Sequence, residues 1–116
     1  MTRQRAERRG RRAETIAAWW LRLHGWRIVA RRARTPRGEV DLVARRGHIL
    51  AFVEVKARGS TAELALAIDA WRMRRVVAAA EALAARFARP GDDIRIDAIL
   101  LAPRKLPLHL TNIWHG

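Results

Sequence analysis

The sequence predicts an α/β fold, a mixed β-sheet flanked by helices in the order α-β-β-β-α-β. One observation is that residues 38–43 and 50–56 alternate in character, are rich in Val, Leu and Phe, and are separated by a short turn at Arg46-Gly47. This pattern is typical of an antiparallel hairpin. A second observation is that a long amphipathic segment, from about residue 61 to 88, joins the hairpin to another apolar strand at residues 94–101. Such crossovers are right-handed, so this strand should run parallel to residues 50–56.

The N-terminal region predicts a helix followed by a strand. From about Arg11, apolar residues recur at the spacing of an amphipathic helix, and Gly25 is well placed to end it. The expected apolar stripe consists of Ala13, Ile16, Ala17, Trp20 and Leu23. Residues 26–31 predict the first strand, and residues 35–38 predict a turn into the hairpin.

Sequence signals mark where the helix and the strands of the C-terminal half begin and end. Residues 60–63 (Ser-Thr-Ala-Glu) have the form of a capping box at the start of the long helix. Arg89-Pro90-Gly91 should stop that helix. After breaks at Pro103 and Pro107, residues 108–114 are expected to form a short edge strand.

Length and composition predict a single domain, residues 11–116, preceded by a basic flexible arm, residues 1–10. The chain of 116 residues is long enough for one core between two packed layers. It contains no cysteine, which excludes disulfides and thiolate metal sites. No apolar run approaches the ~20 residues that span a membrane. We therefore expect a cytoplasmic protein without a membrane partner.

The charge balance favours a polyanionic partner. The chain carries 24 Lys and Arg against 11 Asp and Glu, a net charge of +13, and residues 1–37 contribute 12 arginines against Glu7 and Glu14. Arginine suits phosphate because its planar fork donates two hydrogen bonds at once. Nucleic acid is the commonest partner of this kind. The alternative is that a coding bias towards arginine accounts for the count. The arginines expected to bind phosphate are Arg11, Arg12, Arg32, Arg34 and Arg37.

The hairpin carries charges at alternate positions of an otherwise apolar sheet. Asp41 lies on its first strand, and Glu54 and Lys56 share one face of its second strand. Mg²⁺ is usually held by one or two carboxylates and several waters, which Asp41 and Glu54 could supply. A lysine beside them could orient or deprotonate a water, or offset charge that develops on a phosphodiester. Without a cation, the like charges should raise one carboxylate's pKa while Lys56 opposes the shift.

The motifs Gly38-Glu39-Val40-Asp41-Leu42-Val43 and Phe52-Val53-Glu54-Val55-Lys56-Ala57-Arg58 resemble the core of the PD-(D/E)xK nuclease superfamily. More closely, they resemble the small YraN family, which is similar to archaeal Holliday-junction resolvases. The resemblance runs from about residue 10 to 101. It implies a restriction-endonuclease-like fold and a metal-dependent endonuclease that uses Mg²⁺ or Mn²⁺ on DNA, with branched or junction DNA as one candidate substrate. Resolvase-like relatives dimerise, so a homodimer is one arrangement it implies.

Carried over by residue, the resemblance makes Asp41 and Glu54 metal ligands and Lys56 the catalytic lysine. Glu39 becomes a supporting acid. Glu14, which periodicity alone places at the solvent border of the first helix, matches an acid that faces the metal site. Arg58 should lie near a phosphate. The chain departs from the family pattern at Ala13 (usually Gly), Arg32 (usually Asn) and Trp71-Arg72 (usually a Lys or Gln pair), positions that concern substrate contacts more than chemistry.

Two other readings stay open. The chain could be a nucleic-acid-binding module of the same fold with weak or absent catalysis. It could also be a structural domain in which Asp41, Glu54 and Lys56 form a surface ion-pair cluster. Glu39 fits a solvated residue near a turn as well as a site member. Trp20 and Trp71 fit a core, whereas Trp19 lies off the apolar stripe and is expected to be exposed.

Overall fold

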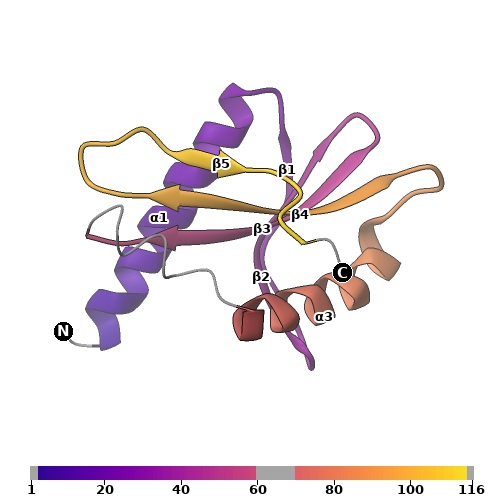
Figure 1. The fold of residues 1–116 in the computed structure, drawn as a ribbon, viewed down its shortest axis with the longest axis horizontal. Coiled ribbons are helices and arrows are strands. Elements are labelled where there is room, and N and C mark those ends of the chain that lie inside the picture. Colours follow the sequence, from indigo (N-terminus) through magenta and orange to yellow (C-terminus); the bar gives the residue numbers. More distant parts are fainter. Residues whose placement is uncertain (1–2, 60–69, 115–116) are drawn as a thin grey trace.

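The computed structural model describes residues 3–59 and 70–114, with side chains from residues 10–59 and 73–114. Two helices and five strands follow one another in this part of the chain (Figure 1). They are α1 (Arg3–Leu23), β1 (Arg27–Thr35), β2 (Gly38–Arg46), β3 (Ile49–Ala57), α3 (Ala70–Phe87), β4 (Asp93–Leu101) and β5 (Leu108–Leu110). The observed order is compatible with the predicted α-β-β-β-α-β core.

The strands form one mixed sheet in the order β1-β2-β3-β4-β5. β1, β2 and β3 are antiparallel neighbours, β4 lies parallel to β3, and the short edge strand β5 returns antiparallel to β4. The parallel pairing of β3 with β4 confirms the predicted crossover. The hairpin between β2 and β3 turns at Gly47, whose φ of 61° is one that glycine adopts without strain.

Within the described residues, α1 covers one face of the sheet and α3 covers the other (Figure 1). Ala51 and Val53 of β3 pack in the cluster that includes α1, whereas Leu50 and Phe52 pack in the cluster that includes α3. This alternation is what the period of a strand requires when both faces are covered. β3 is therefore buried along most of its length, and any charge on it is withdrawn from bulk water.

Helix α1 differs from its predicted form in start and orientation. It begins at Arg3 rather than near Arg11, so residues that were expected to form an arm are helical. Its buried apolar side chains within residues 10–23 are small (Ala13, Ala17, Ala18) apart from Leu21, because small residues let the helix approach the sheet closely. The predicted stripe was wrong at two positions, since Ile16 is 46% exposed and Leu23 is 77% exposed.

The end of α1 confirms its predicted stop signal. Gly25 has a φ of 86°, the left-handed conformation that commonly ends a helix. The N–H groups of Gly25 and Trp26 return to the carbonyls of Arg22 and Leu21, at 3.1 and 3.0 Å. Among the tryptophans, Trp19 is 58% exposed as expected, and Trp20 packs at the edge of the core.

Strand β1 is longer than the predicted segment 26–31, because its arginine-rich second half also pairs with β2. The long helix was expected over residues 61–88. Its described part, α3, ends at Phe87, while the proposed capping box and the side chains of Trp71 and Arg72 lie outside the described residues. No helix in the described part of the chain is long and apolar enough to cross a membrane.

A buried carboxylate on β4 contacts the C-terminal segment that contains β5. Asp97 on β4 is completely buried, and its carboxylate accepts hydrogen bonds from the Arg95 guanidinium at 2.9 Å and the Asn112 N–H at 2.8 Å. The His109 ring nitrogen Nε2 lies 2.8 Å from the same carboxylate. Burial alone would raise the pKa of Asp97, but these partners outweigh it and hold the pKa below its usual value. This group has a structural part in the C-terminal edge.

Candidate metal and nucleic-acid site

The candidate site lies where β2 and β3 part. Followed outward from the hairpin turn, their pairing ends where Leu42 lies opposite Val53. Beyond that point β2 diverges from β3 (Figure 1). Asp41 is the next residue on β2. Its Oδ2 accepts a hydrogen bond from the Val55 N–H at 2.8 Å. The Asp41 side chain thus satisfies a backbone donor that the departing strand leaves without a carbonyl partner.

Glu54 and Lys56 lie on the same face of β3 because they are two residues apart. Lys56 Nζ is 2.6 Å from Glu54 Oε1, and the two residues are only 7% and 9% exposed. An ion pair at this depth has lost most of its hydration, and its attraction must offset that loss. Glu54 and Lys56 are therefore buried, and Asp41 is partly buried, so the three do not form the cluster on an exposed sheet face that the alternative interpretation required.

The Asp41 carboxyl group is strongly affected by this environment. Burial is the largest cause that raises its pKa, and the nearby charge of Glu54 raises it further, with a smaller contribution from Glu14. The Val55 N–H and Lys56 oppose these effects, and the result is a pKa of about 7. The direction agrees with the prediction, but burial, which the prediction did not name, is a larger cause than the repulsion from Glu54. The interaction also shows that the carboxyl groups of Asp41 and Glu54 lie within electrostatic reach of each other.

Helix α1 brings a third acid to the site. Glu14 is 6% exposed, so its expected place at the solvent border was wrong. Arg32 donates a hydrogen bond from Nε to Glu14 Oε1 at 2.7 Å. In the β1–β2 ladder, Arg32 falls beside Asp41, since Arg31 pairs with Leu42 and Ala33 with Val40.

Arg32 also has an unusual backbone. Its φ is 50°, in the left-handed region that side chains other than glycine seldom adopt. The sequence predicted that Arg32 binds phosphate. In the structure its guanidinium is paired with Glu14, which the prediction did not include. The hairpin register could have placed Arg32 beside Asp41, but it carries no signal for the contact with Glu14 on α1.

The structure does not bring Glu39 into the buried cluster. Its side chain is 41% exposed and pairs with Arg34 at 3.2 Å. Arg37 pairs with Glu81 of α3 at 3.3 Å, also at the surface. Exposed pairs of this kind contribute about 0–1 kcal/mol. Arg34 and Arg37 thus remain accessible at the rim, each beside an acid.

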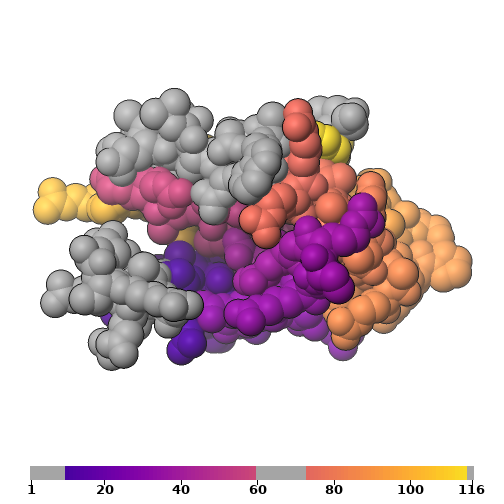
Figure 2. Space-filling model, turned by 90° about the horizontal axis from the view of Figure 1, so that it is seen from below, coloured from indigo at the N-terminus to yellow at the C-terminus, as the bar shows by residue number. Residues whose placement is uncertain are grey.

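Arg12 and Arg58 both line a groove next to the cluster. The groove has a volume of about 360 Å³, and it lies where α1 passes the ends of β3 and β4. Its lining also includes Ala13 and Ala57, the neighbours of Glu14 and Lys56. In Figure 2 the surface is hollowed between the indigo residues of α1 and the magenta residues of β3. Arg11, also predicted to bind phosphate, is exposed on the same helix.

The donor set fits a hard divalent cation. No hydrogen bond from a described residue engages Asp41 Oδ1 or Glu54 Oε2, so each carboxylate keeps an oxygen for a ligand. Within the described residues there is no group of three or more His, Cys, Asp and Glu side chains that could hold a metal ion. Two carboxylates completed by waters is the arrangement that Mg²⁺ commonly takes.

The fold and this cluster define a class of protein: a small α/β protein in which two carboxylates and a lysine gather where a mixed sheet opens. The chain belongs to the uncharacterised protein family UPF0102, whose model matches residues 13–101. It is 70% identical over 114 residues to a UPF0102 protein of Sphingopyxis alaskensis, with 98% of each chain covered. It is 63% identical to one of Rhizorhabdus wittichii and 59% identical to one of Erythrobacter litoralis, again with 98% of this chain covered and 97% and 98% of the relatives.

Proposed function

We propose that this chain is a metal-dependent endonuclease of the PD-(D/E)xK type, related to the YraN family, that hydrolyses phosphodiester bonds of DNA. The observation that carries the proposal is the meeting of Asp41 with Glu54 and Lys56 where β2 leaves β3. Three charged groups in a largely buried position are costly unless they have a task. Their residue types match those that metal-assisted phosphodiester hydrolysis requires.

In this proposal each residue of the cluster has a distinct task. Asp41 and Glu54 would hold Mg²⁺ or Mn²⁺, which when bound would polarise the phosphate and acidify a water. Lys56 would orient that water, or offset the charge that develops on the phosphate oxygens. Glu14, fixed by Arg32, adds negative charge behind the two ligands. Lys56 and Glu54 form an ion pair in this structure, so cation binding would compete with that contact.

The charge of the surface supports DNA as the substrate. The net charge is +13, and the groove beside the cluster presents Arg12 and Arg58 where a phosphate backbone could pass. Branched or junction DNA and a homodimeric enzyme are the finer versions of this proposal. They rest on the resemblance of the two hairpin motifs. A cytoplasmic location is part of the proposal on other grounds, namely the absence of an apolar run of ~20 residues in the sequence.

The test is cleavage of a substrate panel comprising duplex, single strand, flap and four-way junction, with Mg²⁺ or Mn²⁺. Wild type should cleave at least one substrate, and Lys56→Ala should lower the rate by a factor of 10² or more, the usual scale for a group that acts in the transition state. Lys105→Ala is the matched control, because Lys105 is the other lysine of the chain and is exposed on the β4–β5 connection. Equal rates for Lys56→Ala and wild type would refute the proposed chemistry.

The second candidate is a nucleic-acid-binding module without catalysis. The contact that favours it is the 2.6 Å ion pair, which occupies the lysine that catalysis would need. Binding that falls steeply with salt, yet requires neither metal nor Lys56, would select this candidate. A purely structural domain would bind none of the panel.

A further inference from the structure

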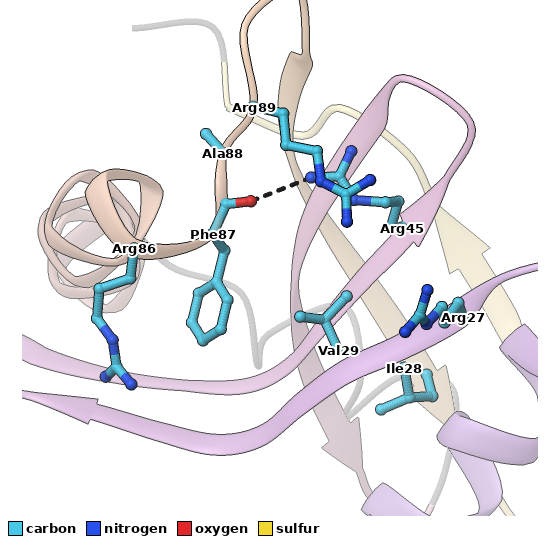
Figure 3. Close-up of a pocket in the computed structure, with 8 residues that line it drawn as sticks. All are labelled: Arg27, Ile28, Val29, Arg45, Arg86, Phe87, Ala88 and Arg89. Atoms are coloured by element: carbon cyan, nitrogen blue, oxygen red, sulfur yellow. Dashed lines mark hydrogen bonds between the residues drawn. The ribbon is translucent and has the colours of Figure 1, made fainter.

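A second pocket lies on the molecule between the start of β1, the end of β2 and the end of α3 (Figure 3). Its volume is about 330 Å³, and four of its eight lining residues are arginines and none is acidic. We call it the arginine pocket; it is lined by Arg27, Ile28, Val29, Arg45, Arg86, Phe87, Ala88 and Arg89. The sequence pattern pointed to none of these arginines as ligands.

Arg45 forms a fixed wall of the arginine pocket. Its guanidinium makes two hydrogen bonds of 2.8 Å to the Asp92 carboxylate. It makes a third, of 3.1 Å, to the Phe87 carbonyl, which Figure 3 shows as a dashed line. The residue is 8% exposed, and the contact holds the pKa of Asp92 below its usual range. Arg45 therefore ties β2 to the end of α3, and its own charge is matched.

The other three guanidiniums have no comparable hydrogen-bonded acid among the described residues. No ion pair or hydrogen bond joins the side chains of Arg27, Arg86 or Arg89 to a described residue. Arg86 lies 5.2 Å from the centroid of the Phe87 ring. Arg89 donates its backbone N–H to Asp92 at 2.6 Å, and its charge makes a small further contribution to the lowered pKa of that carboxyl group. The end of a helix favours cations, but the Phe87 carbonyl already accepts from Arg45. Three like charges around one cavity repel unless an anion enters it.

We propose that the arginine pocket binds a backbone phosphate of nucleic acid, at a distance from the carboxylate–lysine cluster. Arginine forks suit phosphate oxygens. Arg45 is four residues from Asp41 on β2, or ~13 Å at ~3.3 Å per residue. That distance corresponds to about four nucleotides along one strand of a duplex, at ~3.4 Å for each. The exposed Arg31 lies on β1 between the two places. The inference rests on the proposed function only for the choice of nucleic acid as the phosphate carrier.

The test measures how binding of a labelled DNA duplex depends on salt, with the full chain in EDTA so that no cleavage occurs. Arg27→Gln/Arg89→Gln removes two exposed charges from the arginine pocket. Arg74→Gln/Lys105→Gln removes two exposed charges elsewhere. The slope of log K against log salt should fall in magnitude by ~0.9 for each lost phosphate contact in the pocket variant. The control should change far less. Equal changes in both would overturn the proposal, because net charge alone would then explain them.

Inorganic phosphate distinguishes a small-anion site from a backbone site. If phosphate stabilises wild type but not the pocket variant, while both bind DNA with the same slope, the backbone assignment is wrong. Lys56→Ala should retain the wild-type slope. Wild-type cleavage by Lys56→Ala in Mg²⁺, with that slope intact, would count against the proposed function and leave this inference standing. A wild-type slope in a folded pocket variant, with cleavage intact, would do the opposite.

Discussion

At the scale of single residues, Asp41 is the group whose chemistry the fold alters most. Its pKa of about 7 has burial as its main cause, followed by repulsion from Glu54. The unfolded chain should ionise this carboxyl near its ordinary value of 3.8. Between those two values the folded protein therefore holds a proton that the unfolded chain has released, and protonation of Asp41 favours the folded state.

The sign of the resulting pH dependence follows from this difference. The contribution of Asp41 to the free energy of unfolding should be fully present below about pH 3.8 and lost as pH rises through about 7. Each tenfold change in proton affinity is worth ~1.4 kcal/mol, so the loss is on the order of a few kcal/mol. Denaturant unfolding in EDTA between pH 5 and 8 measures it. Asp41→Asn, which stays neutral, should flatten the curve in this window. A variant curve as steep as that of wild type would show that another group is responsible.

The acid–lysine cluster could be predicted from the residues because alternation along β3 fixes Glu54 and Lys56 on one face. The contact between Arg32 and Glu14 could not be predicted. It depends on a left-handed φ at Arg32 and on how α1 lies against β1, neither of which has a local signal. Glu14 was linked to the site by family resemblance, whereas its own periodicity indicated solvent.

At the scale of elements, Gly38 decides how closely α3 can approach the hairpin. It begins β2 with a φ of 155°, and a Cβ added there would lie 2.8 Å from the Arg75 carbonyl oxygen. The glycine of the Gly-Glu-Val-Asp motif is thus explained by packing: helix backbone and strand backbone touch with no side chain between them. Asp41 is three residues further along this strand, so the same approach helps to place the site.

Substitutions of two glycines should have opposite effects on stability. Gly38→Ala should lower the free energy of unfolding by ~1–3 kcal/mol, because helix or strand must shift to admit the methyl group. Gly10→Ala should raise it by ~0.5–1 kcal/mol, since Gly10 is inside α1 with nothing within 4 Å of the added Cβ. Thermal and denaturant unfolding measure both. Wild-type stability in Gly38→Ala would mean that the close approach is not maintained in solution.

The elements themselves were predictable where pattern and packing agree. Strands β2, β3 and β4 combine apolar character with alternation. β3 and β4 were placed within one residue at each end, whereas β2 continues three residues beyond the predicted residue 43. The second half of β1 was missed because Arg31, Arg32 and Arg34 lack the apolar pattern of a strand, and pairing with β2 extends it. The stripe of α1 was misplaced because its close contact with the sheet selects alanine over the larger Ile16 and Leu23.

At the scale of the whole molecule, the charge distribution separates buried from exposed electrostatics. Salt screens the buried ion pairs, such as Arg45 with Asp92 and Lys56 with Glu54, only weakly. The exposed pairs Arg34–Glu39 and Arg37–Glu81 are worth little at any salt concentration. The chain of 116 residues also carries a net charge of +13. The repulsion among these excess positive charges opposes the compact state, and salt screens it.

Added salt should therefore stabilise this protein. Raising NaCl from 20 to about 300 mM shortens the screening length to less than 10 Å, and the relief of self-repulsion should outweigh the loss from the two exposed pairs. We expect a gain on the order of 1 kcal/mol, which corresponds to about 4 °C in Tm for a domain of this size. Scanning calorimetry in NaCl and in KCl measures it, and the two salts should agree because screening depends on ionic strength and not on the cation. A Tm that falls with salt would show that attractive pairs, rather than the excess of arginine, dominate the electrostatics of the fold.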